Sequence, residues 1–127
     1  MARLIPAARA LPALRAYARG EQLSRADQLL AVRFTLQEFA RAHPGQAVEI
    51  RVPPAGAVQA IGGPRHTRGT PPNVVECGIA VWLDLTLGQR SWDDACAGGA
   101  VQWSGTRADL NPYLPLVTER EWSIDDR

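Results

Sequence analysis

The segment from Gly62 to Glu76, GGPRHTRGTPPNVVE, constrains the fold more than any other part of the chain. It contains three glycines and three prolines. A helix is excluded here, because proline removes backbone donors and glycine is costly to order. A connection of this length inside a small domain is usually either functional or disordered. Because each proline fixes its own φ and restrains the residue before it, we expect a stiff loop.

The same loop carries a local positive charge from Arg65, His66 and Arg68, with no acidic residue before Glu76. Arginine binds phosphate or carboxylate through paired hydrogen bonds, so these three side chains are candidates for contact with an anion. The alternative is structural: Arg65 or Arg68 pairs with a carboxylate elsewhere in the chain, such as Asp84, and pins the loop. The sequence leaves both interpretations open.

The chain of 127 residues has room for one core, which needs no metal or disulfide for stability. Its formal net charge of +1 gives no overall drive toward nucleic acid or an anionic membrane. No apolar run approaches the roughly 20 residues of a membrane span, so stable membrane insertion is not expected. Cys77 and Cys96 have no metal-like spacing, and no secretory signal is recognisable. We therefore expect a cytoplasmic protein with no metal or other cofactor, and we make no prediction of its oligomeric state.

The two ends of the chain differ from the middle. Residues 1–23 carry four arginines and a single acidic residue, and Pro6 and Pro12 are expected to interrupt an amphipathic helix. We interpret this part as a partly helical N-terminal arm; a targeting peptide is the less favoured alternative. Residues 118–127 form a charged tail that is expected to fray. The α+β domain then spans residues 24–117.

Periodicity predicts the first elements of this domain. Ser24 followed by Asp27 resembles a capping box that opens a helix extending to about His43. The alternation of apolar and charged residues over 47–52 predicts a strand with one solvated face. A strand over 57–61 follows and is expected to form a hairpin with it.

Shorter elements are expected after the loop. The stretch from Ile79 to Leu87 predicts a helix that is apolar on nearly every side, so protein or a ligand must cover it. The remaining expected elements, in chain order, are a strand at 73–77 before this helix, a short helix capped by Ser91 and Asp94, a strand at 100–104 and a further strand at 108–110.

Two stretches resemble a known family. From Trp82 the sequence WLDLTLGQRSWDDACAGGAVQWSGTRADL resembles the terminal signature of the sterol carrier protein type 2 fold. Upstream, RVPPAGAVQ from Arg51 and the GPRHTRGTPPNVVE run are similar to the actinobacterial "bacterial sterol carrier protein ortholog" proteins. The similarity covers about Ala31 to Leu116. In that family pattern an aspartate stands where this chain has Gly78, which is a weaker cap for the following helix.

The resemblance implies a small, mainly antiparallel five-stranded sheet with helices packed on one face, enclosing an apolar tunnel. It supplies no catalytic residues, so we expect a non-enzymatic protein that binds or transfers a lipid-like ligand, fatty acyl or sterol-like. Each residue expected to line the tunnel could instead fill an ordinary core. These candidates are Trp82, Leu83, Leu85, Leu87, Val101, Trp103 and Leu110.

Two other classes of function stay open. The same fold serves as a non-catalytic partner domain in bacterial thiol-dependent enzymes, which favours an accessory domain with a core filled by side chains and no ligand. A pocket well under the roughly 300 Å³ of typical ligand sites would support that role. The other class is a small-molecule enzyme using Arg65, His66 and Arg68, although no nucleophile and base are recognisable. Nucleic acid is not an expected partner, because no aromatic residue stands among the arginines.

Overall fold

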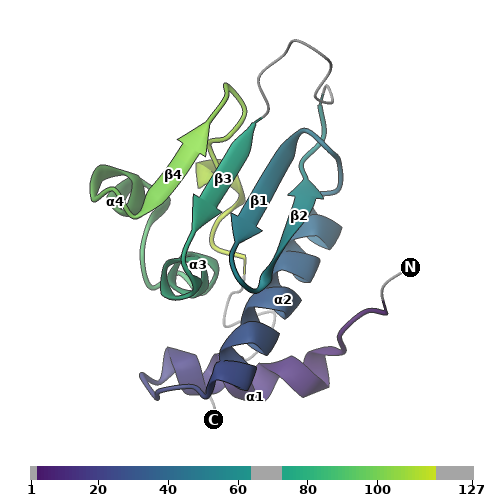
Figure 1. Ribbon diagram of the computed structural model, residues 1–127, viewed down its shortest axis with the longest axis vertical. Coiled ribbons are helices and arrows are strands. Elements are labelled where there is room, and N and C mark those ends of the chain that lie inside the picture. The colour runs from purple at the N-terminus through teal and green to yellow at the C-terminus, as the bar shows by residue number, and fades with distance from the viewer. Residues whose placement is uncertain (1–2, 64–72, 117–127) are drawn as a thin grey trace.

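A computed structural model describes residues 3–63 and 73–116 (Figure 1). The candidate anion-binding residues Arg65, His66 and Arg68 lie outside the described residues. The elements in chain order are α1 (Ala7–Ala18), α2 (Arg25–Ala42), β1 (Val48–Val52), β2 (Gly56–Ala60), β3 (Val74–Cys77), α3 (Ile79–Thr86), α4 (Trp92–Ala97), β4 (Val101–Ser104) and the short 3-10 helix η1 (Asn111–Tyr113).

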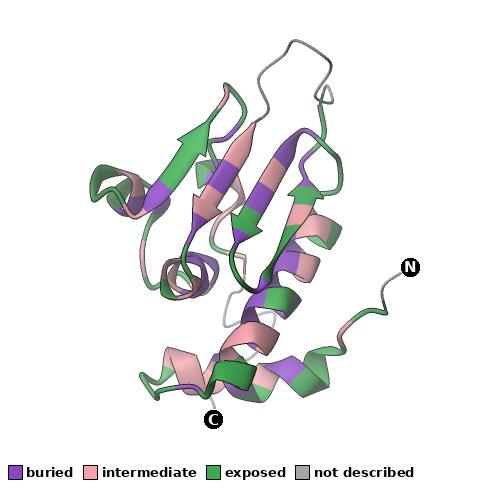
Figure 2. Cartoon of the chain, in the orientation of Figure 1, coloured by how far each residue is buried: buried purple, intermediate pink, exposed green. Residues whose placement is uncertain are grey.

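Helix α2 begins as its sequence predicts. The backbone N–H of Asp27 donates a hydrogen bond to Ser24 Oγ at 3.1 Å, so the serine satisfies a donor that the first turn leaves free. Its apolar side packs against the sheet, with Val32, Leu36 and Phe39 buried (Figures 1 and 2). This helix therefore supplies much of the cover for one face of the sheet.

The described strands form a mixed sheet of four strands in the order β2-β1-β3-β4. The predicted β1–β2 hairpin is confirmed, and β3 and β4 also pair antiparallel. Strands β1 and β3 run parallel, however, with Ile50 opposite Val75. The end of β2 and the start of β3 lie at the same end of the sheet on opposite sides of β1, so β3 must follow the direction of β1.

The structure corrects one further expectation about the sheet and confirms another. Residues 108–110 are irregular and form no strand, although Ala108 and Leu110 are fully buried. A fifth strand is therefore not confirmed among the described residues. The predicted solvated face is confirmed in β1, where Val48, Ile50 and Val52 are buried and the intervening charged residues are not. Alternation of this kind results from the two-residue period of a strand.

Helix α1 runs through Pro12 without a break, contrary to the interruption that the prolines predict. Pro12 lies on the exposed side of the helix, and the carbonyl of Ala8, which proline leaves without a donor, belongs to an exposed residue that water can reach. The opposite side places Ala10 and Leu14 in the core with no exposed surface. The arm is thus helical and packs closely against α2.

Candidate functional site

The central part of α3 fills the core next to α2. Trp82, Leu83 and Leu85 are buried, and the indole Nε1–H of Trp82 donates a hydrogen bond to Thr35 Oγ1 at 2.9 Å. The ring of Phe39 meets the indole edge-on at a centroid distance of 5.8 Å. A hydrogen bond between two fully buried polar groups fixes the orientation of the indole, because breaking it would leave an unpaired donor.

The other residues predicted to line a tunnel are less uniform. Val101 and Leu110 are buried and Leu87 is half-buried, whereas Trp103 on β4 is 52% exposed. Trp103 lies near the thiol of Cys96 on α4. The structure thus brings together Trp82 and the buried aliphatic residues but leaves Trp103 at the surface. Their role in lining a tunnel stays a prediction.

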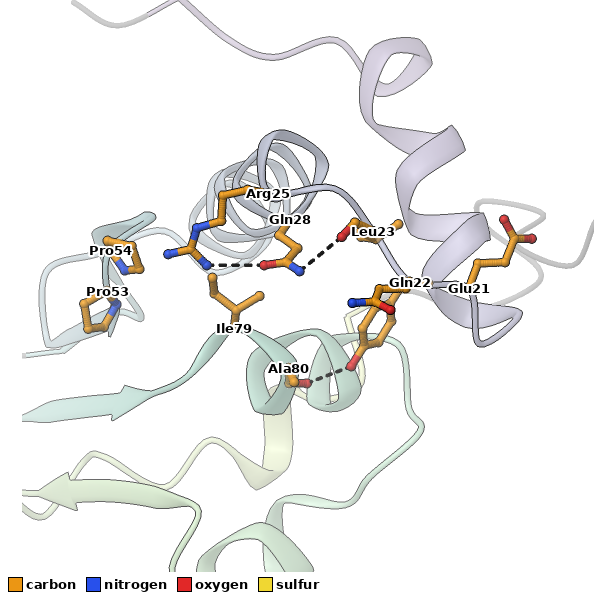
Figure 3. A pocket seen from close by; sticks show the side chains of 10 residues that line it. Glu21, Gln22, Leu23, Arg25, Gln28, Pro53, Pro54, Ile79 and Ala80 are labelled. Atoms are coloured by element: carbon orange, nitrogen blue, oxygen red, sulfur yellow. Dashed lines mark hydrogen bonds between the residues drawn. The ribbon is translucent and has the colours of Figure 1, made fainter.

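A pocket of about 440 Å³ opens beside the start of α3 (Figure 3). It lies between the connection from α1 to α2, the first turns of α2, the β1–β2 turn and the N-terminal turn of α3. Its volume falls within the 300–1,000 Å³ of typical ligand sites. The lining residues are Tyr17, Glu21, Gln22, Leu23, Arg25, Gln28, Pro53, Pro54, Ile79 and Ala80.

The lining of the pocket divides into an apolar and a polar part. Side chains of Leu23, Pro53, Pro54 and Ile79 provide the apolar part. The helix that Ile79 opens has Gly78 as its N-cap, which offers no side-chain hydrogen bond, and its first turn carries no acidic residue. The unpaired N–H groups there give this edge of the pocket a positive partial charge.

Hydrogen bonds hold the polar part in place. Arg25 Nη1 donates to Gln28 Oε1 at 3.3 Å, and Gln28 Nε2 donates to the carbonyl of Leu23 at 3.2 Å (Figure 3). The carboxylate of Glu21 accepts from Arg19 Nε at 2.7 Å, in an exposed ion pair. The carboxylate of Glu21 is thus already paired with an arginine.

Tyr17 closes the pocket on the α1 side. Its hydroxyl donates to Asp84 Oδ1 at 2.7 Å and lies 3.2 Å from the carbonyl of Ala80, joining α1 to α3. Burial, and then the hydrogen bond and negative charge of Asp84, raise the pKa of Tyr17 far above its ordinary value. The phenol is therefore neutral at physiological pH and acts as a fixed donor.

Neither thiol has the environment of a reactive cysteine. Burial, with a smaller contribution from the charge of Glu76, raises the pKa of Cys77 to about 12. The pKa of Cys96 is also raised, mainly by burial. Nucleophilic chemistry requires the thiolate, which both sites disfavour. No group of three or more His, Cys, Asp or Glu side chains within residues 3–63 and 73–116 could hold a metal ion.

Sequence reasoning identified none of the pocket residues as a site. They come from separate segments: the helix that contains Arg25 and Gln28, the connection between the first two strands and the helix at Ile79 were predicted as local structure, but nothing in the sequence joined them into one site. No periodicity links Arg25 to Ile79, because the two meet only when α2 and α3 pack together. The available signal was the absence of a capping side chain at Gly78, which leaves the start of α3 open.

The fold and the pocket define a small α+β domain with a helix-covered mixed sheet and a ligand-sized pocket that borders the first turn of α3. A family model described as "Bacterial SCP ortholog" matches residues 24–116, so the chain belongs to the family of bacterial sterol carrier protein orthologs. The resemblance inferred from the sequence is thereby confirmed. No match was found among curated proteins. No helix in the described part of the chain is long and apolar enough to cross a membrane.

Proposed function

We propose that this protein binds a lipid-like apolar ligand without chemically changing it, and that the pocket beside α3 receives the ligand. The observation that carries the proposal is a pocket of about 440 Å³ with an apolar part formed by Leu23, Pro53, Pro54 and Ile79. Membership of a sterol carrier protein family suggests lipid binding or transfer in general terms. Six of the ten lining residues lie within the matched residues, 24–116, and the other four, Tyr17 and residues 21–23, directly precede them.

The affinity would come from burying hydrocarbon. Each methylene removed from water contributes about 0.8 kcal/mol, so a fatty acyl or sterol-like ligand needs only part of its length in the pocket. Ile79 and Trp82 stand on one helix, three residues apart. The predicted tunnel past Trp82 would extend the site inward if the filled core around that indole opens.

A second candidate, an accessory domain without a ligand, is supported by Trp103. This indole is 52% exposed on the edge strand β4, and large exposed aromatics are enriched in interfaces. The volume of the pocket, above the roughly 300 Å³ expected of a ligand site, favours lipid binding instead. The enzymatic alternative rests on Arg65, His66 and Arg68, which are outside the described residues.

The test compares Ile79→Glu with Leu4→Glu in the full chain, using oleyl alcohol as the ligand. Glutamate at position 79 places a carboxylate against the apolar part of the pocket, so affinity should fall about tenfold or more. The variant should stay folded, because an acidic residue in the first turn of a helix is favourable. Leu4 is 56% exposed and does not line the pocket, so its variant adds the same charge without affecting binding.

Affinity is read by displacement of a fluorescent fatty acid, and stability by melting temperature. Native mass spectrometry of protein purified from its host should also show bound lipid. A wild-type protein that is uniformly empty and whose melting temperature does not rise with oleyl alcohol would refute the proposal. If the wild type and Ile79→Glu bind oleyl alcohol with equal affinity, the ligand binds somewhere other than this pocket.

A further inference from the structure

We propose that the pocket selects lipids with an anionic head, and that Arg25 is the residue that determines this specificity, oriented by Gln28. The inference rests on the proposed lipid binding and adds the charge of the ligand and the residue that reads it. It starts from the hydrogen bond between Arg25 Nη1 and Gln28 Oε1, which joins the guanidinium to a neutral amide.

Arg25 has no carboxylate partner among the described residues. The other two arginines of α2 are occupied: Arg33 Nε donates to the carbonyl of Ala55 at 2.8 Å, and Arg41 Nη1 lies 3.1 Å from Glu38 Oε2. These two contacts have evident structural roles, between α2 and the β1–β2 turn and within the last turns of the helix. Arg25 is exposed and lines the pocket, and its hydrogen bond to Gln28 leaves most of its five donors available to a ligand there.

The position of Arg25 in α2 has no stabilising effect that would explain it. It is the first residue of the helix, where the macrodipole favours negative charge and disfavours a cation. Its hydrogen bond to Gln28, at 3.3 Å, is long and exposed. The helix would therefore be at least as stable with a neutral residue at position 25, which points to a role outside helix stability.

The charge of the pocket rests on Arg25. Glu21 is the acidic residue in the lining, and its carboxylate is already paired with Arg19 at 2.7 Å. Asp84, which bonds the hydroxyl of Tyr17, is not part of the lining. A ligand entering the pocket thus meets one cation whose donors are not committed to a carboxylate.

The placement of Arg25 suits an amphiphile. Figure 3 shows its guanidinium between Gln28 and the two prolines, on the side of the pocket where Ile79 lies. A hydrocarbon chain resting on Ile79, Pro53 and Pro54 would bring its head next to Arg25. Guanidinium groups bind carboxylate and phosphate through paired hydrogen bonds, so either head would be accepted. Gln28, held by the carbonyl of Leu23, limits the movement of the guanidinium.

The experiment measures the affinity of the full chain for oleate, oleyl phosphate and oleyl alcohol at pH 8, where both acids are ionised and the hydrocarbon is the same. The variants are Arg25→Gln, Arg25→Lys and Gln28→Leu, with Arg41→Gln as the matched control at the other end of α2. Arg41→Gln also removes one positive charge, but far outside the pocket and beyond the range of unscreened attraction.

The wild type should bind oleate or oleyl phosphate about tenfold more tightly than oleyl alcohol. Arg25→Gln should abolish that preference, whereas Arg25→Lys should retain part of it and Arg41→Gln all of it. Gln28→Leu should reduce the preference two- to fivefold without weakening oleyl alcohol, a result that a merely structural role would not produce. The two anions distinguish a carboxylate from a phosphate head.

Several outcomes overturn the inference, and they differ in whether lipid binding itself still stands. If the wild type binds all three lipids equally, or Arg25→Gln weakens all three alike, the head is not read by Arg25 and lipid binding itself stands. If the wild type binds none of them, the proposed function fails together with the inference. Loss of the preference in Arg41→Gln would also overturn it, since long-range charge would then explain the selectivity.

Discussion

The first turn and the centre of α3 meet opposite surroundings, although both are apolar. Trp82 and Leu83 are fully buried against α2, whereas Ile79 and Ala80, one turn earlier, are partly open to a pocket of about 440 Å³. The two stretches differ in what faces them. The ring of Phe39 and the hydroxyl of Thr35 contact Trp82. The β1–β2 turn, by contrast, lines the same pocket as Ile79. One apolar helix can thus supply a closed core and an open binding surface.

Apolar character alone does not distinguish a ligand-binding surface from a core. Side chains fill the space around Trp82 because Phe39 and Thr35 stand at the right positions on α2. Near Ile79, α2 is at its first turn and presents Arg25 and Gln28, whose side chains are polar. The polar side chains at the start of α2 leave the apolar turn of α3 uncovered.

The largest effect is expected from Trp82→Ala, which tests whether the centre of α3 lies in a filled core. If the indole fills the core, its removal should cost about 3–5 kcal/mol of unfolding free energy, because surrounding helices cannot collapse onto the cavity. Urea denaturation followed by circular dichroism measures the loss. A cost below about 1 kcal/mol would show that the space around the indole is already loose, as an empty tunnel would be.

A finer test concerns the hydrogen bond that orients the indole. Thr35→Val should cost about 1–3 kcal/mol, since it leaves the buried Nε1–H of Trp82 without an acceptor. Thr86→Val is the matched control: Thr86 is equally buried, but its hydroxyl donates only to the carbonyl of Leu83 in its own helix. Equal costs for the two variants, again from urea denaturation, would contradict a special role for the Thr35 contact.

The smallest expected effect concerns Cys77, the buried last residue of β3, which directly precedes α3. The folded pKa of about 12 lies above the ordinary value of 9.0, so the thiol stabilises the fold fully below pH 9 and this contribution is lost as pH rises toward 12. At pH 10 the loss should be about 1.4 kcal/mol. Urea midpoints at pH 8 and pH 10 for the wild type and Cys77→Ala measure it. The urea midpoint of Cys77→Ala should fall less between pH 8 and pH 10 than that of the wild type. Equal falls would show that the thiol is exposed to water in the folded protein.

Local signals predicted most of the elements. The Ser24–Asp27 cap, the alternation in β1 and the Ser91–Asp94 cap each depend on residues within one or two turns, and the structure confirms all three. Caps and strand alternation can be predicted from the sequence because the residues that produce them are close along the chain.

What could not be predicted depends on contacts between distant segments. The parallel pairing of β1 with β3 follows from which side of β1 the chain returns to, and no residue of the strands specifies that. The helix through Pro12 persists because the proline faces water, which only the packing of α1 decides. The pocket at Ile79 is likewise made of segments that meet only in the folded chain.

The packing of α1 has a consequence for what counts as a folding unit in this protein. The family match begins at residue 24, yet Ala10 and Leu14 are fully buried, and the side chain of Gln37 bonds both the N–H and the carbonyl of Ile5, at 2.7 and 2.9 Å. A protein shortened to the matched region would expose the side of α2 that α1 covers, and the side-chain amide of Gln37 would lose both hydrogen bonds to Ile5. The smallest unit that keeps these contacts therefore starts before the matched family region, at or ahead of Ile5.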